Sequence, residues 1–312
     1  VVKFRSGDTT DAQALFEQSL PVLFSRSRQS SSDEADAARE GRLAVIGESY
    51  IELLAGLTNE DSVSRSFEIA QLIGNRTVQS ALDKSGARAA ARDPQMAELA
   101  RREQDAQKQV GALNGRLAYH LSLAGSEHDE EVIEDLRVRI DGLRETRADL
   151  MSSLESGFPD YAELINPKPL NLAGVQSYLH EDEALISFYV GEERSYVWAL
   201  RNAGEVEFAP IEYGEAEIAQ FVGALRLALS PDAQTLGDIP EFDLQTGHAL
   251  FGALLAPVES AWKDKAHLLV VPHKALGFLP LSVLPMQSTE LADETGPLFS
   301  NYQAVPWLIR NH

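Results

Sequence analysis

Histidine is the residue type in this chain best suited to proton transfer or metal binding, because the sequence contains seven histidines and no cysteine. The chain has no G-x-S-x-G turn, no phosphate-binding glycine loop, no H-E-x-x-H helix and no EF-hand loop. In the C-terminal part, no spacing fixes a serine or aspartate partner for His248, His267, His273 or His312. We therefore assign no catalytic, cofactor-binding or metal-binding residue within the 312 residues.

His273 is the most suggestive of the seven histidines. It follows Pro272, which ends the apolar run His267–Val271. Active-site loops of open α/β sheets lie after the strands, so this is a position where chemistry occurs in many folds. The simpler interpretation is a polar turn residue without a chemical role, and we favour it.

Two further histidines lie in helical surroundings. His120 falls on an apolar helix seam, where no second type of metal ligand faces it, so we expect a core histidine rather than a ligand. His128 is followed by Asp129, Glu130 and Glu131, which resembles a metal cluster. Because this group stands at a helix start, a capping and surface role is the preferred interpretation.

The composition limits the kinds of partner. A net charge of −21 argues against nucleic acid and against an anionic membrane surface, since both are bound through Lys and Arg. The acidity is concentrated in Glu181–Ser260, which holds fifteen Asp and Glu against three Arg and no Lys. We favour a solvated surface, and the alternative is a face that attracts basic peptide segments.

The absence of cysteine excludes disulfides, thiolate metal sites and a cysteine nucleophile within these residues. No apolar run approaches the roughly 20 residues that a membrane helix needs. The chain starts with Val1 and has no hydrophobic signal segment there. We expect a cytoplasmic protein, and we interpret the sequence as a piece of a longer chain.

The N-terminal half has helical periodicity. Apolar residues recur at intervals of three and four in residues 34–57, and a further helix is expected from Val63 to Leu82. Asp93-Pro94 is a helix start, and two heptad-patterned series between residues 93 and 155 predict an antiparallel coiled-coil hairpin. No convincing internal repeat is present, although a degenerate repeat array in residues 1–92 remains open.

The C-terminal half changes to strand patterns. Residues 184–190, 195–200 and 205–211 predict an antiparallel meander, because their connections are short. Two helices are then expected, over residues 218–229 and 242–258.

Two more strands are expected further along. The apolar run His267–Val271, which stops at Pro272, predicts a central strand buried on both faces. Leu281–Leu284 returns to the core, and Val305–Ile309 predicts the start of another strand.

Several of these segments, in this order, resemble a CHAT domain, the caspase-like cysteine peptidase module often found behind helical repeats. The resemblance rests on Ala266–Pro285, with its strand, polar turn and Phe-Leu-Pro, on Tyr161–Leu172, on Ala184–Leu200 and on Ala256–Val258. It covers roughly residues 160 to 312, and the helical region upstream is similar to the spacer before such domains.

The resemblance implies a reaction in which a thiolate attacks a peptide carbonyl and a histidine moves the proton. It places that His–Cys pair beyond His312, so no residue here carries over and the chain is expected to be inactive alone. It implies no cofactor. The expected partners are proteins or peptides, including the missing C-terminal part of the same domain.

Two functions therefore stand. The chain is the helical spacer and opening portion of a CHAT-type peptidase, or it is a non-catalytic assembly scaffold that pairs through its hairpin. A self-contained serine hydrolase is a distant third.

The predicted fold is α followed by α/β: a helical half with a long hairpin, then an incomplete caspase-like domain. The expected boundaries are a helical region at 1–92, the hairpin at 93–155, a linker at 156–183 and the α/β part at 184–312. An incomplete open sheet exposes an unpaired edge, so we expect aggregation or completion by another chain.

Overall fold

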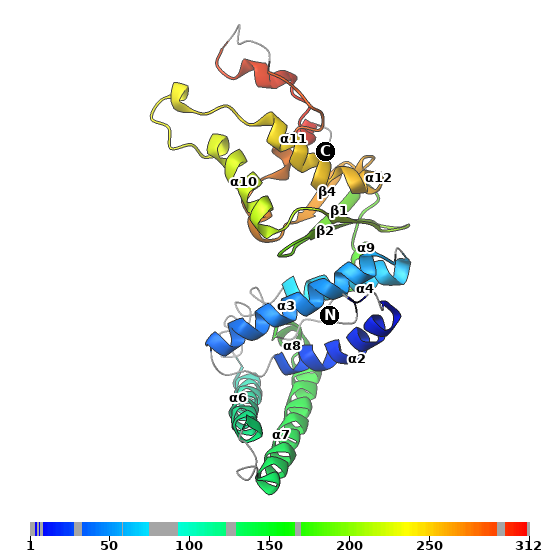
Figure 1. Cartoon of the computed structure of the whole chain (residues 1–312), viewed down its shortest axis with the longest axis vertical. Coiled ribbons are helices and arrows are strands. Elements are labelled where there is room, and N and C mark those ends of the chain that lie inside the picture. Colours follow the sequence, from blue (N-terminus) through cyan, green and yellow to red (C-terminus); the bar gives the residue numbers. More distant parts are fainter. Residues whose placement is uncertain are drawn as a thin grey trace. The chain divides into compact units, whose positions relative to one another are not determined.

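The computed structural model describes Phe4, Ser6 and residues 9–27, 33–57, 59–74, 93–122, 129–165, 170–291 and 297–310 (Figure 1). The chain forms two compact units, and each unit draws on two stretches of sequence. Unit 1 comprises Val1–Leu53 and Gln71–Pro169, and unit 2 comprises Leu54–Ala70 and Leu170–His312.

Unit 1 is helical, as predicted. Its helices are α2 (Thr9–Ser27), α3 (Asp33–Ala55), α6 (Pro94–Ser122), α7 (Glu130–Gly157) and α8 (Pro159–Ile165). Phe16 of α2 stacks on Tyr50 of α3 with ring centroids 4.8 Å apart, and the Tyr50 hydroxyl donates to the Glu17 carboxylate. Aromatic stacking and this hydrogen bond fix α2 against α3.

The predicted hairpin is present as α6 and α7, and both helices begin where the sequence indicates. The Asp93 carboxylate accepts hydrogen bonds from the backbone N–H groups of the first turn of α6, and Asp129 does the same for α7. The two helices bury an aliphatic seam between them, made of Val110, Leu113, Leu136 and Ile140. Heptad spacing therefore converts directly into the packed pair.

One ion pair lies inside the hairpin. Glu103 of α6 and Arg147 of α7 are both largely buried, and the Arg147 Nε donates to Glu103 Oε1 at 2.8 Å. A buried pair of this kind is satisfied only when the two helices keep one register. At the base of the hairpin, Tyr161 of α8 packs against Ala100 and Leu154.

Within the residues that the structure describes, unit 2 contains one mixed sheet of four strands. The strands are β1 (Glu183–Val190), β2 (Ser195–Arg201), β3 (Glu207–Ile211) and β4 (His267–Val271), in the order β3-β2-β1-β4. β1, β2 and β3 are antiparallel, which confirms the predicted meander, whereas β4 runs parallel to β1. The last connection therefore passes through the helices that lie between β3 and β4.

The helices of unit 2 cover the sheet. They are α4 (Glu60–Gly74), α9 (Leu172–Gln176), α10 (Glu215–Leu229), α11 (Leu244–Leu254) and α12 (Glu259–Trp262). Figure 1 shows α10, α11 and α12 on one side of the sheet, where Leu250 and Trp262 share a core with Ile186 and Val197. Short 3-10 helices complete the unit: η2 (Leu236–Asp238), η3 (Ala256–Val258), η4 (Lys274–Phe278), η5 (Leu281–Val283), η6 (Ser300–Ala304) and η7 (Leu308–Arg310).

The other face of β2 is covered by α4, which is distant in sequence. Trp198 of β2 donates from Nε1 to the Ser66 hydroxyl at 3.1 Å and meets the Phe67 ring edge-on at 5.8 Å. Residues 54–70 belong to unit 2 because of such contacts. The predicted third helix is thus confirmed as α4, although its expected end at Val78 and Leu82 lies outside the described residues.

The prediction that His267–Val271 is a central strand buried on both faces is wrong. Among the described strands β4 is last in the sheet, and Leu269, Val270 and Val271 are 43%, 37% and 47% exposed. Leu268 packs against the core that the helices share with β1 and β2, whereas the three residues after it remain partly exposed.

The prediction of a strand at Val305–Ile309 is also wrong. Trp307 forms an isolated bridge with Pro285, and Leu308–Arg310 is the 3-10 helix η7. Pro285 and Pro306 lack backbone N–H groups, so a regular ladder cannot extend along this pair of segments. Leu281 and Leu284 do return to the core, as expected.

The segment expected as a linker, 156–183, contains α8 and α9, and residues 166–169 lie outside the described part. Within the described ranges, no helix has the length and apolar character needed to cross a bilayer.

Candidate functional site

The candidate site lies at β4, where unit 2 presents apolar surface beside a sheet edge. β4 is hydrogen-bonded to β1 and to no other strand that the structure describes. Parallel strands are normally paired on both sides and covered on both faces. An exposed parallel edge strand of Leu and Val is therefore a surface suited to another segment of polypeptide.

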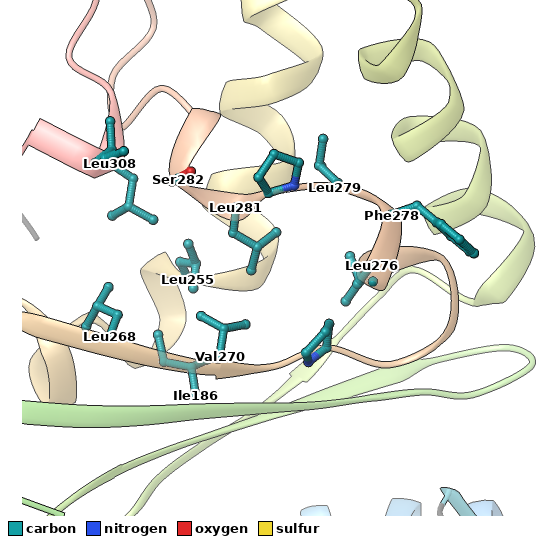
Figure 2. A pocket seen from close by; sticks show the side chains of 14 residues that line it. Ile186, Leu255, Leu268, Val270, Leu276, Phe278, Leu279, Leu281, Ser282 and Leu308 are labelled. Carbon is teal, nitrogen blue, oxygen red and sulfur yellow. The ribbon is translucent and has the colours of Figure 1, made fainter. Parts of the chain in front are cut away.

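A groove of about 510 Å³ opens on one face of this edge, and we call it the β4 groove. Its floor is formed by Leu268 and Val270 of β4 and by Ile186, which is paired with Val270. The segment Leu276–Ser282 forms a wall. Figure 2 shows Leu281 and Val270 pointing toward each other across this space. The remaining lining residues are Leu255, Pro272, Leu308 and Ile309.

The wall is attached to the end of β1 through His273. The Val190 backbone N–H donates to His273 Nδ1 at 2.9 Å, and the His273 ring stacks on Tyr189 with centroids 4.9 Å apart. Burial lowers the pKa of His273, Lys274 acts in the same direction, and Glu215 opposes them. Because Nδ1 accepts a hydrogen bond, it carries no proton in this arrangement.

Two cationic side chains hold the rest of the wall against α10. Lys274 has a positive φ of 50°, an uncommon value for a residue with a side chain, and its ammonium lies 2.5 Å from the Glu215 carboxylate. Arg226 donates to the Phe278 carbonyl at 3.3 Å and lies over the Phe278 ring, 5.5 Å from its centroid. The wall is therefore attached just before its first residue and again at Phe278 before anything enters the groove.

The histidines singled out in the sequence are not brought together. His248 Nδ1 lies 3.2 Å from the Pro285 carbonyl, and His267 Nε2 lies 3.7 Å from Asp182. His273 serves as a turn residue that positions the wall. His128 and His312 lie outside the described residues.

His120 lies on the hairpin, with its ring edge-on to Tyr119 at 5.6 Å. Its buried Nδ1 has no hydrogen-bond partner among the residues that the structure describes. Within the same residues, no three His, Asp or Glu side chains gather in a way that suits a metal ion.

Sequence reasoning did not identify Tyr189 and Arg226 as parts of the site. Both act on residues far along the chain, and neither stands in a recognisable motif. No protein-family model, curated protein or solved structure matches this chain.

The unfolding free energy is expected to fall as pH drops below about 6.5, in a way that depends on His273. The unfolded chain binds the proton near pH 6.5, whereas the native pKa is lower, so protonation favours unfolding until pH falls below the native pKa. His273→Asn keeps an acceptor for the Val190 N–H and does not titrate. Because the ring is partly solvated, we expect its share to be about 1 kcal/mol or less between pH 7.5 and 5.5.

Urea unfolding of both proteins at the two pH values measures this difference, and the other six histidines cancel. The charged groups nearest the ring, Lys274 and Glu215, are unchanged in the variant. Equal pH dependence in the two proteins contradicts the prediction.

Proposed function

We propose that this chain is the N-terminal portion of a CHAT-type cysteine peptidase. It supplies the helical regulatory and assembly region and the first strands of the peptidase domain, without the catalytic His–Cys pair. The observation that carries the proposal is β4: a parallel strand at the sheet edge, apolar and exposed, with a groove beside it. The downstream part of the domain would add strands at this edge.

The proposed peptidase reaction needs residues from outside this chain. A cysteine peptidase needs a thiolate nucleophile and a histidine that moves the proton, and this sequence has no cysteine. His273 is not offered as that histidine, because its Nδ1 accepts from Val190 N–H and its ring stacks on Tyr189. The role of this chain is then to build the first strands and one wall beside the growing sheet.

The proposed partners are proteins or peptides, with the downstream half of the same domain first among them, and the proposal includes a cytoplasmic location. No nucleic acid, membrane or cofactor enters the proposal. The excess of carboxylates in Glu181–Ser260 favours a substrate with basic side chains.

The test extends the chain past His312 with the residues that follow it in its natural sequence. The extended protein is expected to cleave peptides with a basic residue at the cleavage position, while the 312-residue chain is inactive. Replacing the downstream Cys by Ala and, separately, the downstream His by Ala should each abolish cleavage. An extended protein without such a pair, or one whose cleavage survives both substitutions, overturns the proposal.

A second candidate function is a non-catalytic assembly scaffold built on the hairpin. It is favoured by apolar side chains exposed near the end of the hairpin, since Tyr119 and Val138 are each 63% exposed and Leu121 is 47% exposed. An extended protein that is inactive but oligomerises through residues 93–155 supports this alternative.

A further inference from the structure

The β4 groove lies where a helix would normally pack on a sheet. Its floor is one face of two parallel strands, β1 and β4, and the element that covers a parallel strand is normally a helix. Leu254, the last residue of α11, shares a core with Ile186 of β1, and the next residue, Leu255, lines the groove. Leu268 of β4 packs against the same core, but Val270 is 37% exposed, so the cover over β4 is incomplete at the groove.

The lining carries no charge. Among the fourteen lining residues, Ser282 has the only polar side chain and Gly277 has no side chain. An occupant must therefore present an uncharged aliphatic face to the floor, because a buried charge without a partner is costly. A volume of about 510 Å³ accommodates the side chains that a helix presents at positions i, i+3, i+4 and i+7.

The border of the groove is cationic at two places, in a chain whose net charge is −21. Arg226 lies over Phe278, and although it donates to the Phe278 carbonyl, a guanidinium has further N–H groups to offer. Arg310 is exposed and follows the lining residue Ile309. The acidic partner of the nearby Lys274 is Glu215, so that pair is neutral as a whole. Carboxylates are the groups that complement this border.

We propose that the β4 groove binds an amphipathic helix with an aliphatic face and with carboxylates along its flanks. The inference rests on the proposed function, because such a helix would belong to the segment that completes the sheet.

The probe is a synthetic fluorescent peptide of about 18 residues, with Leu at i, i+3, i+4 and i+7 and Glu on both flanks. A matched peptide carries Lys in place of the Glu. Binding to the 312-residue chain is measured by fluorescence anisotropy at low ionic strength. The Glu-flanked peptide should bind at least about fivefold more tightly than the Lys-flanked one.

Two glycine variants supply a steric control. Gly277 lines the groove, and a Cβ added there meets no atom within 4 Å, so Gly277→Leu should fold normally and place a bulky side chain at the groove wall. Gly252 in α11 is equally unobstructed and does not line the groove, so Gly252→Leu is the matched control. We expect Gly277→Leu to weaken binding about tenfold or more and Gly252→Leu to leave it unchanged.

A charge reversal tests the flanks. The double variant Arg226→Glu with Arg310→Glu should lose the preference for the Glu-flanked peptide and favour the Lys-flanked one. If neither Gly277→Leu nor the charge reversal changes the affinity for the two peptides, the inference is wrong. A dimer of the chain that Gly277→Leu converts to monomer also overturns it, because the occupant is then a second copy.

The inference and the proposed function fail in different ways. If the extended protein cleaves peptides but the 312-residue chain binds neither synthetic peptide, the helix-binding groove is wrong and the peptidase proposal stands. An inactive extended protein, beside specific binding of the Glu-flanked peptide, leads to the reverse conclusion.

Discussion

Gly214→Ala is expected to destabilise unit 2 by at least about 2 kcal/mol. An added Cβ at Gly214 would clash with the backbone oxygen of Glu192 and would lie 3.0 Å from the carbonyl carbons of Glu192 and Glu193. These are backbone atoms of the β1–β2 turn, so no side-chain rotation relieves the clash. The turn must move away from α10, which strains the hydrogen bond from Glu215 N–H to the Gly191 carbonyl at 2.9 Å.

Gly223 provides the control for this substitution. It lies in the middle of α10, it is exposed, and a Cβ there meets no atom within 4 Å. Gly223→Ala should therefore stabilise the protein by roughly 0.5–1 kcal/mol through helix propensity. Urea unfolding followed by far-UV circular dichroism measures both. A Gly214→Ala protein as stable as the parent would show that the turn and α10 yield without cost.

The hairpin and its starts were predictable because the responsible interactions are local. Asp93 and Asp129 cap the helices that immediately follow them, and the heptads of α6 and α7 bury the seam that their spacing defines. The meander of β1, β2 and β3 was predictable for a similar reason, since short connections leave neighbouring strands only one antiparallel arrangement.

The position of β4 was not predictable from its own residues. A run of Leu and Val has the same composition whether strands lie on one side of it or on both. Its exposure follows from what the rest of the unit places beside it. The prediction of a strand at Val305–Ile309 was wrong for another reason. It followed the apolar pattern of the segment and gave too little weight to Pro306, which cannot donate a hydrogen bond to a strand ladder.

The site itself depends on contacts between distant residues. His273 accepts a hydrogen bond from Val190, 83 residues earlier, and the Phe278 carbonyl accepts one from Arg226, 52 residues earlier. Gly214 has φ −89°, which any residue adopts, so only its closeness to Glu192 requires glycine. Residue spacing in the sequence does not predict such long-range contacts, although these contacts shape the β4 groove.

Trp198→Ala is expected to destabilise unit 2 by about 3–5 kcal/mol. Trp198 is 1% exposed, and its ring meets Phe67 at 5.8 Å and Phe208 at 5.2 Å. Its Nε1 donates to the Ser66 hydroxyl, which itself donates to the Val63 carbonyl. Truncation leaves a cavity between β2 and α4 and removes a hydrogen bond that joins residues 132 positions apart.

Trp198→Phe separates the two contributions, because it retains much of the aromatic packing and loses only the Nε1 donor and part of the ring. It should cost roughly 1–2 kcal/mol. Urea unfolding by circular dichroism gives the free energies, and amide hydrogen exchange tests where the loss occurs. Since Trp198 binds α4 to the sheet, exchange in residues 60–70 should accelerate more in Trp198→Ala than exchange in α6 and α7, which belong to unit 1. Uniform acceleration, or α4 amides as protected as in the parent, would mean that α4 is held by other contacts and that residues 54–70 join unit 2 for a different reason.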